Sequence, residues 1–432
     1  MCIRDRRLEE SARLLERAKR VIPAYTQTLS KNPTQWVQGV APAYVSRAEG
    51  AHVWDVDGNR YLDFPMALGP IILGYGHPAV SEAIERQLRD GIVFTLPHPV
   101  EVEVAERIAA LVPCADRVRF AKTGSDATTA SVRLARACTG RDGVIVCGYH
   151  GWQDWYIGTT SRAIGVPEAV RALSDSFVLN DLGSLDAALE RQAGTTAAVV
   201  LEPVGAEEPQ EGFLQGVVER AHAAGALVVF DEIITGFRLA PGGAQERYGV
   251  VPDLAAFGKA LGNGMPISAL VGKAEYMDRL EDVFFSGTHG SEALSLAAAN
   301  AVLDELTPSL YEALFSRGER LRTGVQEAIE ETGVGELVTI DGAAPRTVTV
   351  VREPESSDGQ LLARSIVQQE LLKQGVLFNG SNFISAAHTD EDIDHAVASY
   401  REAFNVLSDA LRTGDLEAAL DGSPVQPAFR AL

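Results

Sequence analysis

The sequence predicts an α/β protein with a large, doubly wound, mostly parallel sheet domain and a smaller α+β domain. Two observations support this prediction. Short apolar runs alternate with helical patterns through the middle of the chain, and after about residue 310 the pattern changes to helices flanking one short strand. The apolar runs cover residues 144–146, 197–201, 226–230, 254–257 and 267–271.

Helices are expected between these strands. One helix lies before the run at 226–230, and Gly225 ends it, as parallel α/β architecture requires. Its apolar face consists of Leu214, Val217, Val218 and Ala221. An earlier amphipathic helix ends before Pro113, and its apolar face consists of Val104, Ile108 and Leu111.

Both ends of the chain carry recognisable elements. Residues 51–64 alternate apolar and polar positions around Asp57-Gly58-Asn59, which predicts a hairpin with a tight turn. Residues 346–351, RTVTVV, predict a strand. The last helix has Thr389 as its expected N-cap and acidic residues in its first turn. Its predicted apolar face is Ile393, Val397, Tyr400, Phe404 and Leu407.

The length of the chain and the change of pattern after about residue 310 predict a division into two domains. Its 432 residues exceed the roughly 250 to 300 at which a single core stops growing. We expect residues 1–65 to join the small domain, 66–310 to form the large domain, and 311–432 to complete the small one.

Composition limits the partners and the compartment. A net charge of −21 argues against nucleic acid or an anionic membrane, because either would repel the protein. No run reaches the roughly 20 apolar residues of a membrane span. The cysteines show neither CxxC pairing nor metal-ligand spacing, which favours reduced thiols and a cytoplasmic location. They are Cys2, Cys114, Cys138 and Cys147.

Three segments in chain order carry the strongest chemical signal: 230–232 (FDE), 257–259 (FGK) and 286–288 (SGT). Alone, an Asp at a strand end is usually a cap, and a Lys after a strand is usually a solvated surface group. Together they suit pyridoxal 5′-phosphate (PLP), which needs an amine for a Schiff base and a carboxylate at its pyridine nitrogen. Lys259 and Asp231 would supply these two groups.

A phosphate site is predicted where residues 122–127, KTGSDA, lead into a helical pattern. The competing interpretation is an ordinary Ser or Asp helix cap. Further candidates fall after neighbouring strands: Tyr149 or His150 could stack on a pyridine ring, and Glu202 also ends a strand. The alternative for the aromatic residues is core packing.

Other catalytic motifs are missing from the sequence. It has no GxSxG elbow, no HExxH, no GxxxxGK[ST] and no clustered metal ligands among its eight histidines. We therefore expect no metal site.

The ordered motifs resemble the class III, fold type I PLP-dependent aminotransferases, and most of all the branch that includes glutamate-1-semialdehyde 2,1-aminomutase. The resemblance covers nearly the whole chain. It is carried by residues 54–64 (WDVDGNRYLDF), 73–78 (LGYGHP), 133–141 (RLARACTGR), 148–151 (GYHG), 201–204 (LEPV), 230–238 (FDEIITGFR), 242–254 (GGAQERYGVVPDL) and 257–266 (FGKALGNGMP).

The resemblance implies a role for each matching residue. Lys259 would be the Schiff-base lysine and Asp231 the partner of the pyridine nitrogen. Ile233 and Tyr149 would sandwich the ring. Gly124 and Ser125 would hold the phosphate, and Thr288 would reach the phosphate bound mainly by the other subunit. A homodimer with a shared active site follows from this last role.

Three functions are weighed against each other. The first is a ping-pong aminotransferase that moves an amino group from an amino acid or amine to a keto acid or carbonyl acceptor. The alternative is the intramolecular amino transfer of the aminomutase, but that enzyme's Gly-Ser-Gly loop is not recognisable in residues 152–167. The third, a non-catalytic protein of the same fold, would be expected to lack Lys259 or Asp231.

Substrate recognition has one weak candidate in the sequence. Arg238 could meet a substrate carboxylate, or it could form a salt bridge that supports the loop after Asp231. The sequence does not distinguish between these two roles of Arg238.

Overall fold

The structure is a computed structural model that describes residues 7–357 and 360–427. The chain forms two compact units. The first unit joins the segment that ends at His77 to the segment that begins at Glu312, and the second unit runs from Pro78 to Tyr311. Residues 66–77, which the sequence analysis assigns to the large domain, belong to the first unit. Their backbone bonds include those between Gly50 and Tyr75.

The second unit is built on a seven-stranded sheet with the order β4-β10-β9-β8-β7-β5-β6. Strands β5 to β9 pair in parallel, whereas β10 is antiparallel to both of its neighbours. The strands are β4 (Arg117–Ala121), β5 (Gly143–Cys147), β6 (Ser174–Ser176), β7 (Thr196–Leu201), β8 (Leu227–Glu232), β9 (Leu254–Phe257) and β10 (Ser268–Gly272). The five predicted strands are confirmed, and the sheet adds β4 and β6.

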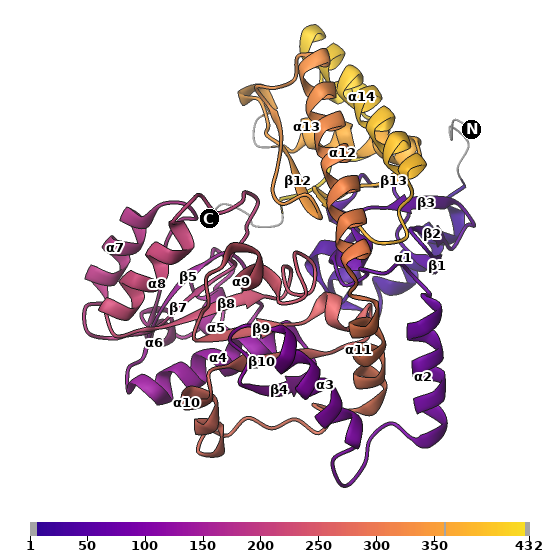
Figure 1. Ribbon diagram of the computed structural model, residues 1–432. Helices are drawn as coiled ribbons and strands as arrows, with labels where there is room; N and C mark the ends of the chain where they lie inside the picture. The colour runs from indigo at the N-terminus through magenta and orange to yellow at the C-terminus, as the bar shows by residue number, and fades with distance from the viewer. Residues whose placement is uncertain (1–6, 358–359, 428–432) are drawn as a thin grey trace. The chain divides into compact units, whose positions relative to one another are not determined.

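Helices cover both faces of this sheet, so every residue of β5, β7, β8, β9 and β10 is buried. In Figure 1, α4 lies on one side of the sheet, and α7 and α8 lie on the other. Apolar side chains of α4 pack with those of the central strands in one core cluster. Burial on both faces explains why these strands read as continuous apolar runs rather than alternating patterns.

The other elements of the second unit surround this sheet. The predicted helices around Val104 and Leu214 are confirmed as α3 and α8. The helices are α2 (Pro78–Asp90), α3 (Pro99–Leu111), α4 (Gly124–Thr139), α5 (Asp154–Ile157), α6 (Glu168–Arg171), α7 (Leu182–Arg191), α8 (Phe213–Ala223), α9 (Gly243–Tyr248), α10 (Ala274–Met277) and α11 (Ala293–Glu305), with 3₁₀ turns at Lys259–Gly262 and Asp278–Glu281.

The first unit contains two small sheets with the orders β1-β2-β3-β13 and β11-β12-β14. The strands are β1 (Val45–Glu49), β2 (His52–Asp55), β3 (Arg60–Asp63), β11 (Val338–Asp341), β12 (Arg346–Val351), β13 (Val376–Leu377) and β14 (Ser381–Phe383). The helices are α1 (Glu9–Ala18), α12 (Pro308–Thr332, which starts in the second unit), α13 (Leu362–Lys373) and α14 (Asp390–Thr413). Short 3₁₀ turns lie at Pro23–Tyr25, Leu29–Lys31, Pro33–Gln35, Met66–Leu68, Glu355–Ser357 and Glu417–Ala419.

Local signals at both ends of the chain are confirmed. Strands β2 and β3 form the predicted antiparallel hairpin, and the turn residue Asp57 also accepts the Glu10 and Ser11 N–H groups of α1. Thr389 caps α14 in a capping box with Asp392.

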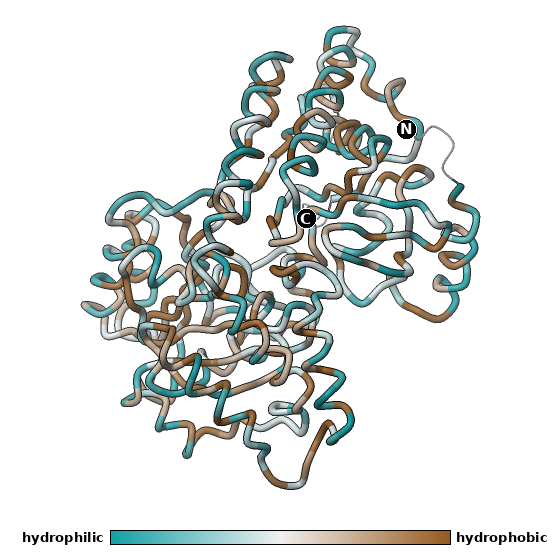
Figure 2. Tube along the Cα trace, turned by 45° about the vertical axis from the view of Figure 1, so that its right-hand side comes forward, coloured by the Kyte–Doolittle hydropathy of each residue, from teal (hydrophilic) through white to brown (hydrophobic). Residues whose placement is uncertain are grey.

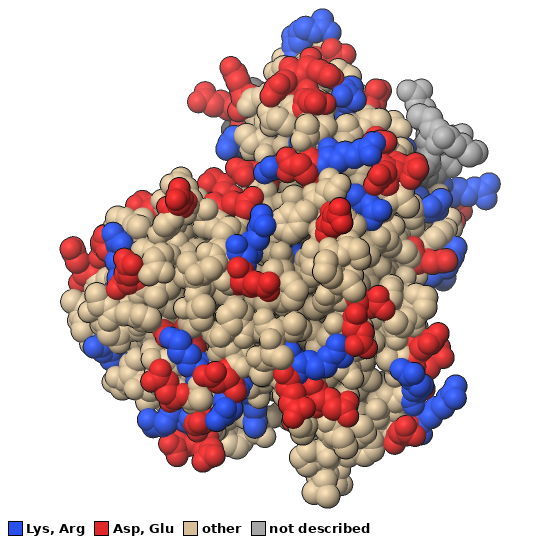
Figure 3. All heavy atoms as spheres, in the orientation of Figure 1, with Lys and Arg blue, Asp and Glu red and all other residues tan. Residues whose placement is uncertain are grey.

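Side-chain polarity follows the predicted elements. The helices in Figure 2 alternate between teal and brown along their turns, as expected for helices with one buried face. Figure 3 shows acidic and basic side chains interspersed over the visible face.

Among the described residues, no helix is long and apolar enough to cross a membrane. Cys114, Cys138 and Cys147 are free thiols, and Cys2 lies outside the described residues.

Candidate active site

A cavity of about 170 Å³ lies in the second unit, where the parallel strands end. Tyr149 and His150 follow β5, Glu202 follows β7, Asp231 is the last residue but one of β8, and Lys259 follows β9. Because the carboxyl ends of parallel strands meet at one edge of a sheet, these side chains converge. The complete lining is Gly124, Ser125, Thr128, Tyr149, His150, Gly151, Glu202, Asp231, Ile233, Ile234 and Lys259.

Asp231 is held by two hydrogen bonds inside the protein. Its Oδ2 lies 2.8 Å from Nδ1 of His150, and its Oδ1 accepts the Ile233 N–H at 3.1 Å. Asp231 is 3% exposed and His150 is 2% exposed, so this contact is screened from solvent. The two bonds fix the orientation of the Asp231 carboxylate in the cavity.

His150 lies behind Asp231. Its ring is nearly parallel to that of Trp155, at 15° and 6.1 Å between centroids, and its backbone carbonyl accepts the Thr128 hydroxyl. The other ring nitrogen, Nε2, is buried and has no hydrogen-bond partner among the described residues. An Nδ1–H tautomer that donates to Asp231 fits this environment, since the buried Nε2 then carries no N–H that would need an acceptor.

Tyr149 is positioned by Glu202 and is 58% exposed. Oε2 of Glu202 accepts the Tyr149 N–H at 2.9 Å. Burial raises the pKa of the Tyr149 phenol, and the carboxylates of Glu202 and Asp231 add to that increase. Position 148, directly before Tyr149, requires glycine. The φ of Gly148 is +103°, and a Cβ there would lie 2.5 Å from Oε2 of Glu202.

The N-terminus of α4 borders the cavity. Thr123 and Asp126 form a capping box, which bonds the Thr123 and Asp126 N–H groups and leaves those of Gly124 and Ser125 at the open end of the helix. A helix N-terminus of this kind favours an anion. Gly151, with a φ of +110°, lets the loop after β5 approach Ser125, because a Cβ there would collide with Oγ of Ser125.

Ile233 lies between two glycines of the cavity region. A Cβ added to Gly124 would lie 3.0 Å from Cδ1 of Ile233, and one added to Gly258 would lie 3.1 Å from the same atom. The isoleucine therefore packs against the first residue of α4 and the loop before Lys259. Lys259 is half-buried and has a φ of +38°, in the left-handed region that non-glycine residues rarely adopt.

Thr288 does not line this cavity in the same chain. It is exposed and borders a second cavity of about 520 Å³, together with Arg119, Lys122 and Ser286. The implied role of Thr288 toward another subunit stays a prediction. Arg238 is fully buried and is not part of the lining of the cavity that contains Lys259.

Glu232, for which the sequence predicts no role, is fully buried beside Asp231. Its carboxylate accepts the Thr235 hydroxyl at 2.5 Å and the N–H groups of Ala244 and Gln245 at 2.8 and 3.0 Å. Burial raises the pKa of Glu232, and these donors act against that increase. Glu232 thus ties the loop after Asp231 to α9. Nothing in the sequence distinguishes such an anchor from an ordinary strand-end acid.

The donor set fits PLP. A helix N-terminus, whose first N–H groups have no partner within the helix, suits its phosphate. An oriented carboxylate suits its ring nitrogen, and a lysine lines the same cavity. The approach of Gly151 to Ser125 gives that end of the cavity a tight wall. Among the described residues, no group of three His, Cys, Asp or Glu could hold a metal ion.

Comparison with known proteins agrees with this geometry. Residues 35–382 match the family model described as "Aminotransferase class-III". The chain is 36% identical to a glutamate-1-semialdehyde 2,1-aminomutase of Sorangium cellulosum, over 92% of this chain and 96% of the relative. It is 34% identical to a 3-aminobutyryl-CoA aminotransferase of Cloacimonas acidaminovorans, over 92% and 97%.

A solved structure extends the comparison to the fold. The FumI protein of Sphingopyxis sp. MTA144, in its PLP internal aldimine form, superposes with a TM-score of 0.84 at 31% identity, over 96% of this chain and 98% of that one. The fold is thus that of the fold type I PLP-dependent enzymes, and pyridoxal phosphate is the cofactor. The chain belongs to the class III aminotransferase family.

Proposed function

We propose that this enzyme transfers an amino group from an amino acid or amine to a separate carbonyl acceptor, in two half-reactions at the cavity that contains Lys259. The observation that carries the proposal is the meeting of Lys259, Asp231 and the N-terminus of α4 in one cavity. When bound, PLP supplies an electron sink for the carbanion left after a substrate C–H proton departs.

Each group of the cavity has a task in this proposal. Nζ of Lys259 would hold the cofactor through its aldehyde carbon and would move a proton from the donor's carbon. The carboxylate of Asp231 would keep a proton on the ring nitrogen. The N–H groups of Gly124 and Ser125 would bind the phosphate, and Ile233 would pack against the ring.

A second candidate is an isomerase that moves the amino group within one molecule. Similarity to the Sorangium aminomutase favours it. Against it, residues 152–167 lack the Gly-Ser-Gly loop of the aminomutase branch. The two functions differ in one requirement, because only the transferase needs a second substrate.

The test mixes the purified holoenzyme with candidate amino donors and no acceptor, while the visible absorption of the cofactor is followed. Transamination predicts that one donor class converts all of the cofactor to its amine form, and that pyruvate or 2-oxoglutarate restores the original spectrum. A donor that is isomerised without any keto acid would decide for the second candidate. If no donor changes the spectrum, the proposal is wrong.

The role of Lys259 has a test that does not depend on turnover. Borohydride reduction should raise the mass of the wild-type chain by one reduced cofactor. The same treatment should leave Lys259→Ala unmodified, whereas Lys19→Ala, which alters a surface lysine paired with Glu16, should behave as wild type. Cofactor fixed to Lys259→Ala would refute the assignment.

We also propose a homodimer in which Thr288 serves the partner's phosphate site. Thr288 is exposed and outside its own chain's cavity. Apolar side chains are also exposed around residues 88–102, and a second copy would bury them. They are Leu88, Ile92, Val93, Phe94, Leu96 and Val102.

Hybrid dimers test this arrangement. Mixed Lys259→Ala and Thr288→Ala chains should form dimers in which one site has every residue intact, so mixing should restore activity above that of either variant alone. If Thr288 serves its own chain, mixing restores nothing. A monomer by light scattering would also refute the proposal.

A cytoplasmic location remains part of the proposal. The cysteines of the described chain are free thiols, as a reducing compartment favours. Fractionation of the source cells, with the protein detected by antibody, would test the location.

A further inference from the structure

Two buried aromatic residues contact the wall of the cavity that contains Lys259, and the proposed function gives them no task. Trp155 and Tyr156 belong to the short helix α5 and are 5% and 6% exposed. Neither of them lines the cavity. Both belong to the core cluster that packs α4 on the central strands, so core packing is one role that explains their burial. Their contacts with His150 and Tyr149 indicate a second role.

Trp155 is fixed on α4. Its Nε1–H donates to Oγ1 of Thr129 at 3.0 Å, and its backbone carbonyl accepts the Ser174 hydroxyl at 2.6 Å. The same helix holds the loop that carries His150, because the Thr128 hydroxyl donates to the His150 carbonyl at 3.0 Å. Trp155 and His150 are therefore both anchored to the helix whose N-terminus is the proposed phosphate site.

The imidazole of His150 has an α5 ring on two sides. It lies nearly parallel to the ring of Trp155, and the Tyr156 ring meets it edge-to-face, at 77° and 5.3 Å between centroids. Aromatic rings attract each other in both arrangements at such distances. A hydrogen bond weakens steeply when its angle departs from linearity. These two contacts thus help to hold Nδ1 of His150 in line with Oδ2 of Asp231.

Tyr156 also contacts Tyr149, the other aromatic residue of the cavity after β5. The two rings lie edge-to-face, at 83° and 5.5 Å between centroids. Tyr149 is 58% exposed, and the bond to Glu202 holds its backbone N–H rather than its ring. The contact with Tyr156 is therefore a direct constraint on the orientation of the Tyr149 ring.

We propose that Tyr156, supported by Trp155, is a positioning residue for amino transfer: it keeps His150 in its hydrogen bond with Asp231 and keeps the Tyr149 ring oriented at the cavity. The inference rests on the proposed function, because Asp231 and Tyr149 take their tasks from it. Tyr156 itself touches neither substrate nor cofactor. A residue that only fills the core would stabilise the fold and leave the cofactor's surroundings unchanged, so the two roles can be separated by measurement.

The first test is a pH titration of the cofactor's visible absorption in the holoenzyme, with no substrate present. Tyr156→Leu removes the ring and keeps an apolar side chain. The titration midpoint should differ from that of wild type by about 0.5 to 1 pH unit, the size expected for the loss of an aromatic pair. The shift should have the same direction as that of His150→Phe, which removes the hydrogen bond to Asp231 outright.

The shift cannot come from ionisation of Tyr156 itself. Burial raises the pKa of its phenol, and the nearby carboxylates of Glu202 and Asp231 add to that increase. The phenol therefore stays neutral at and below neutral pH. A change in the titration must come from the groups that Tyr156 contacts.

Two further measurements trace the path of the effect. In a chain that already carries His150→Phe, Tyr156→Leu should add no further shift of the midpoint, because it acts on Asp231 through His150. Equilibrium dialysis of Tyr156→Leu should show cofactor binding that is weaker by about fivefold, since the Tyr149 ring loses its support.

Two controls separate positioning from stability. Tyr156→Phe keeps both ring contacts and should match wild type in the titration and in dialysis. Phe404→Leu removes a fully buried ring that packs on Tyr400 and does not line the cavity. It should lower the melting temperature and leave the midpoint and the cofactor affinity unchanged. If Tyr156→Leu does not fold, Tyr156→Met takes its place, because methionine adapts to irregular gaps.

Four results would overturn the inference: a folded Tyr156→Leu that keeps either the midpoint or the cofactor affinity of wild type, a double variant that shifts further than His150→Phe alone, a Tyr156→Phe that shifts as far as Tyr156→Leu, or the same changes in Phe404→Leu. The proposed function fails separately. If no donor converts the cofactor but the midpoint and affinity change as described, Tyr156 positions the site and the transamination proposal alone is wrong.

Discussion

Replacing His150 with phenylalanine removes one hydrogen bond from Asp231 and little else. The phenyl ring is somewhat larger than the imidazole and can retain the nearly parallel packing on Trp155. It loses Nδ1, which lies 2.8 Å from Oδ2 of Asp231. Because both residues are almost fully buried, water does not readily replace the lost donor.

The size of the effect follows from this geometry. A hydrogen bond to a charged group contributes about 1.5 to 3 kcal/mol, and 1.36 kcal/mol is a tenfold change in rate or binding. If that energy serves to orient Asp231 toward the ring nitrogen, His150→Phe should lower kcat/KM by roughly 10- to 150-fold. His150 acts here as a positioning residue, through Asp231.

The assay compares wild type, His150→Phe and His150→Asn. Asparagine can place Nδ2 near the position of the histidine Nδ1, so it should recover part of the lost activity. The pH dependence of the cofactor's visible absorption should also move in His150→Phe if Asp231 holds the proton on the ring nitrogen, as proposed. A kcat/KM within threefold of wild type, with an unchanged absorption profile and a normal melting temperature, would refute the reasoning.

Three further predictions concern the second unit. Glu232→Gln should lose about 1 to 3 kcal/mol in urea unfolding, because the amide leaves at least one buried N–H of the loop without an acceptor. Gly151→Ala should weaken cofactor binding at least about tenfold in equilibrium dialysis, because its Cβ collides with Ser125 at a φ of +110°. Burial raises the pKa of the Asp253 carboxyl. Hydrogen bonds to this carboxyl, including one from Lys273, outweigh burial and hold the pKa below its usual value. Asp253→Asn should therefore be less stable than wild type at pH 7, and the difference should shrink as pH falls below about 4, where the lowered pKa no longer stabilises the fold.

Each of these predictions has a matched control. Glu219→Gln alters an exposed helix carboxylate and should change the free energy of unfolding by less than about 0.5 kcal/mol. Gly165 has a φ of +89° with nothing near its Cβ position, so Gly165→Ala adds backbone strain without affecting the cofactor. Asp186→Asn breaks a half-exposed pair with Arg220 and should show little pH dependence.

The corresponding failures are specific. Glu232→Gln with wild-type stability would mean that the loop supplies another acceptor. Equal cofactor affinity in the two glycine variants would show that the contact with Ser125 does not shape the phosphate site. A stability difference for Asp253→Asn that is constant from pH 7 to 3.5 would contradict the lowered pKa.

The sequence by itself determined the elements whose causes are local. The capping box at Thr389, the hairpin turn at Asp57 and the apolar runs of the central strands each depend on residues close together in the chain. Strands β4 and β6 escaped prediction, because RVRFA and SDS contain too few apolar residues to reveal a strand. Their positions in the sheet depend on pairing with other strands: β4 pairs with β10, and β6 pairs with β5.

For the site, the sequence predicted Lys259, Asp231 and the Gly124-Ser125 pair, since strand ends and helix starts are local features and the ordered motifs resemble one family. The structure brings these residues to one cavity. The sequence could not reveal that His150 supports Asp231, 81 residues away. Contacts of this kind arise only when separate strands end at one edge of the sheet.

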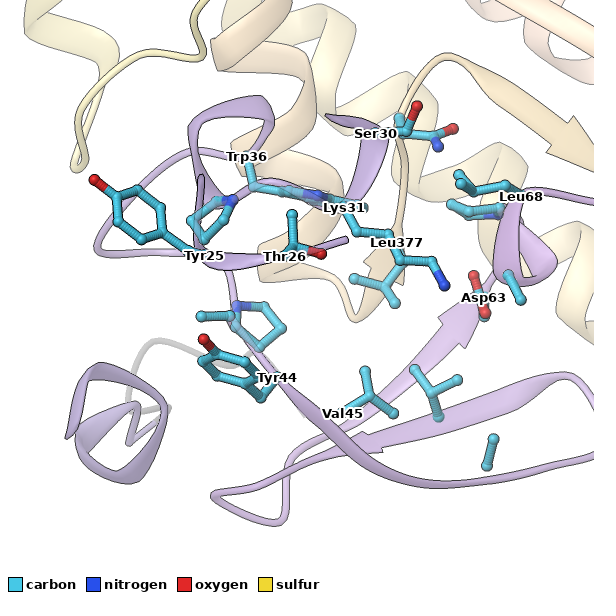
Figure 4. Close-up of a pocket in the computed structure, with 18 of the residues that line it drawn as sticks. Tyr25, Thr26, Ser30, Lys31, Trp36, Tyr44, Val45, Asp63, Leu68 and Leu377 are labelled. Carbon is cyan, nitrogen blue, oxygen red and sulfur yellow. The ribbon is translucent and has the colours of Figure 1, made fainter. Parts of the chain in front are cut away.

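A cavity of about 390 Å³ in the first unit also depends on contacts between distant parts of the chain (Figure 4). Its walls unite residues near Lys31 with Leu377, and neither segment shows a pattern that predicts a cavity. Only tertiary structure decided that the buried Asp63 would accept the Tyr75 hydroxyl. Hydrogen bonds and burial depend on which distant residues meet, and the linear sequence does not specify those neighbours.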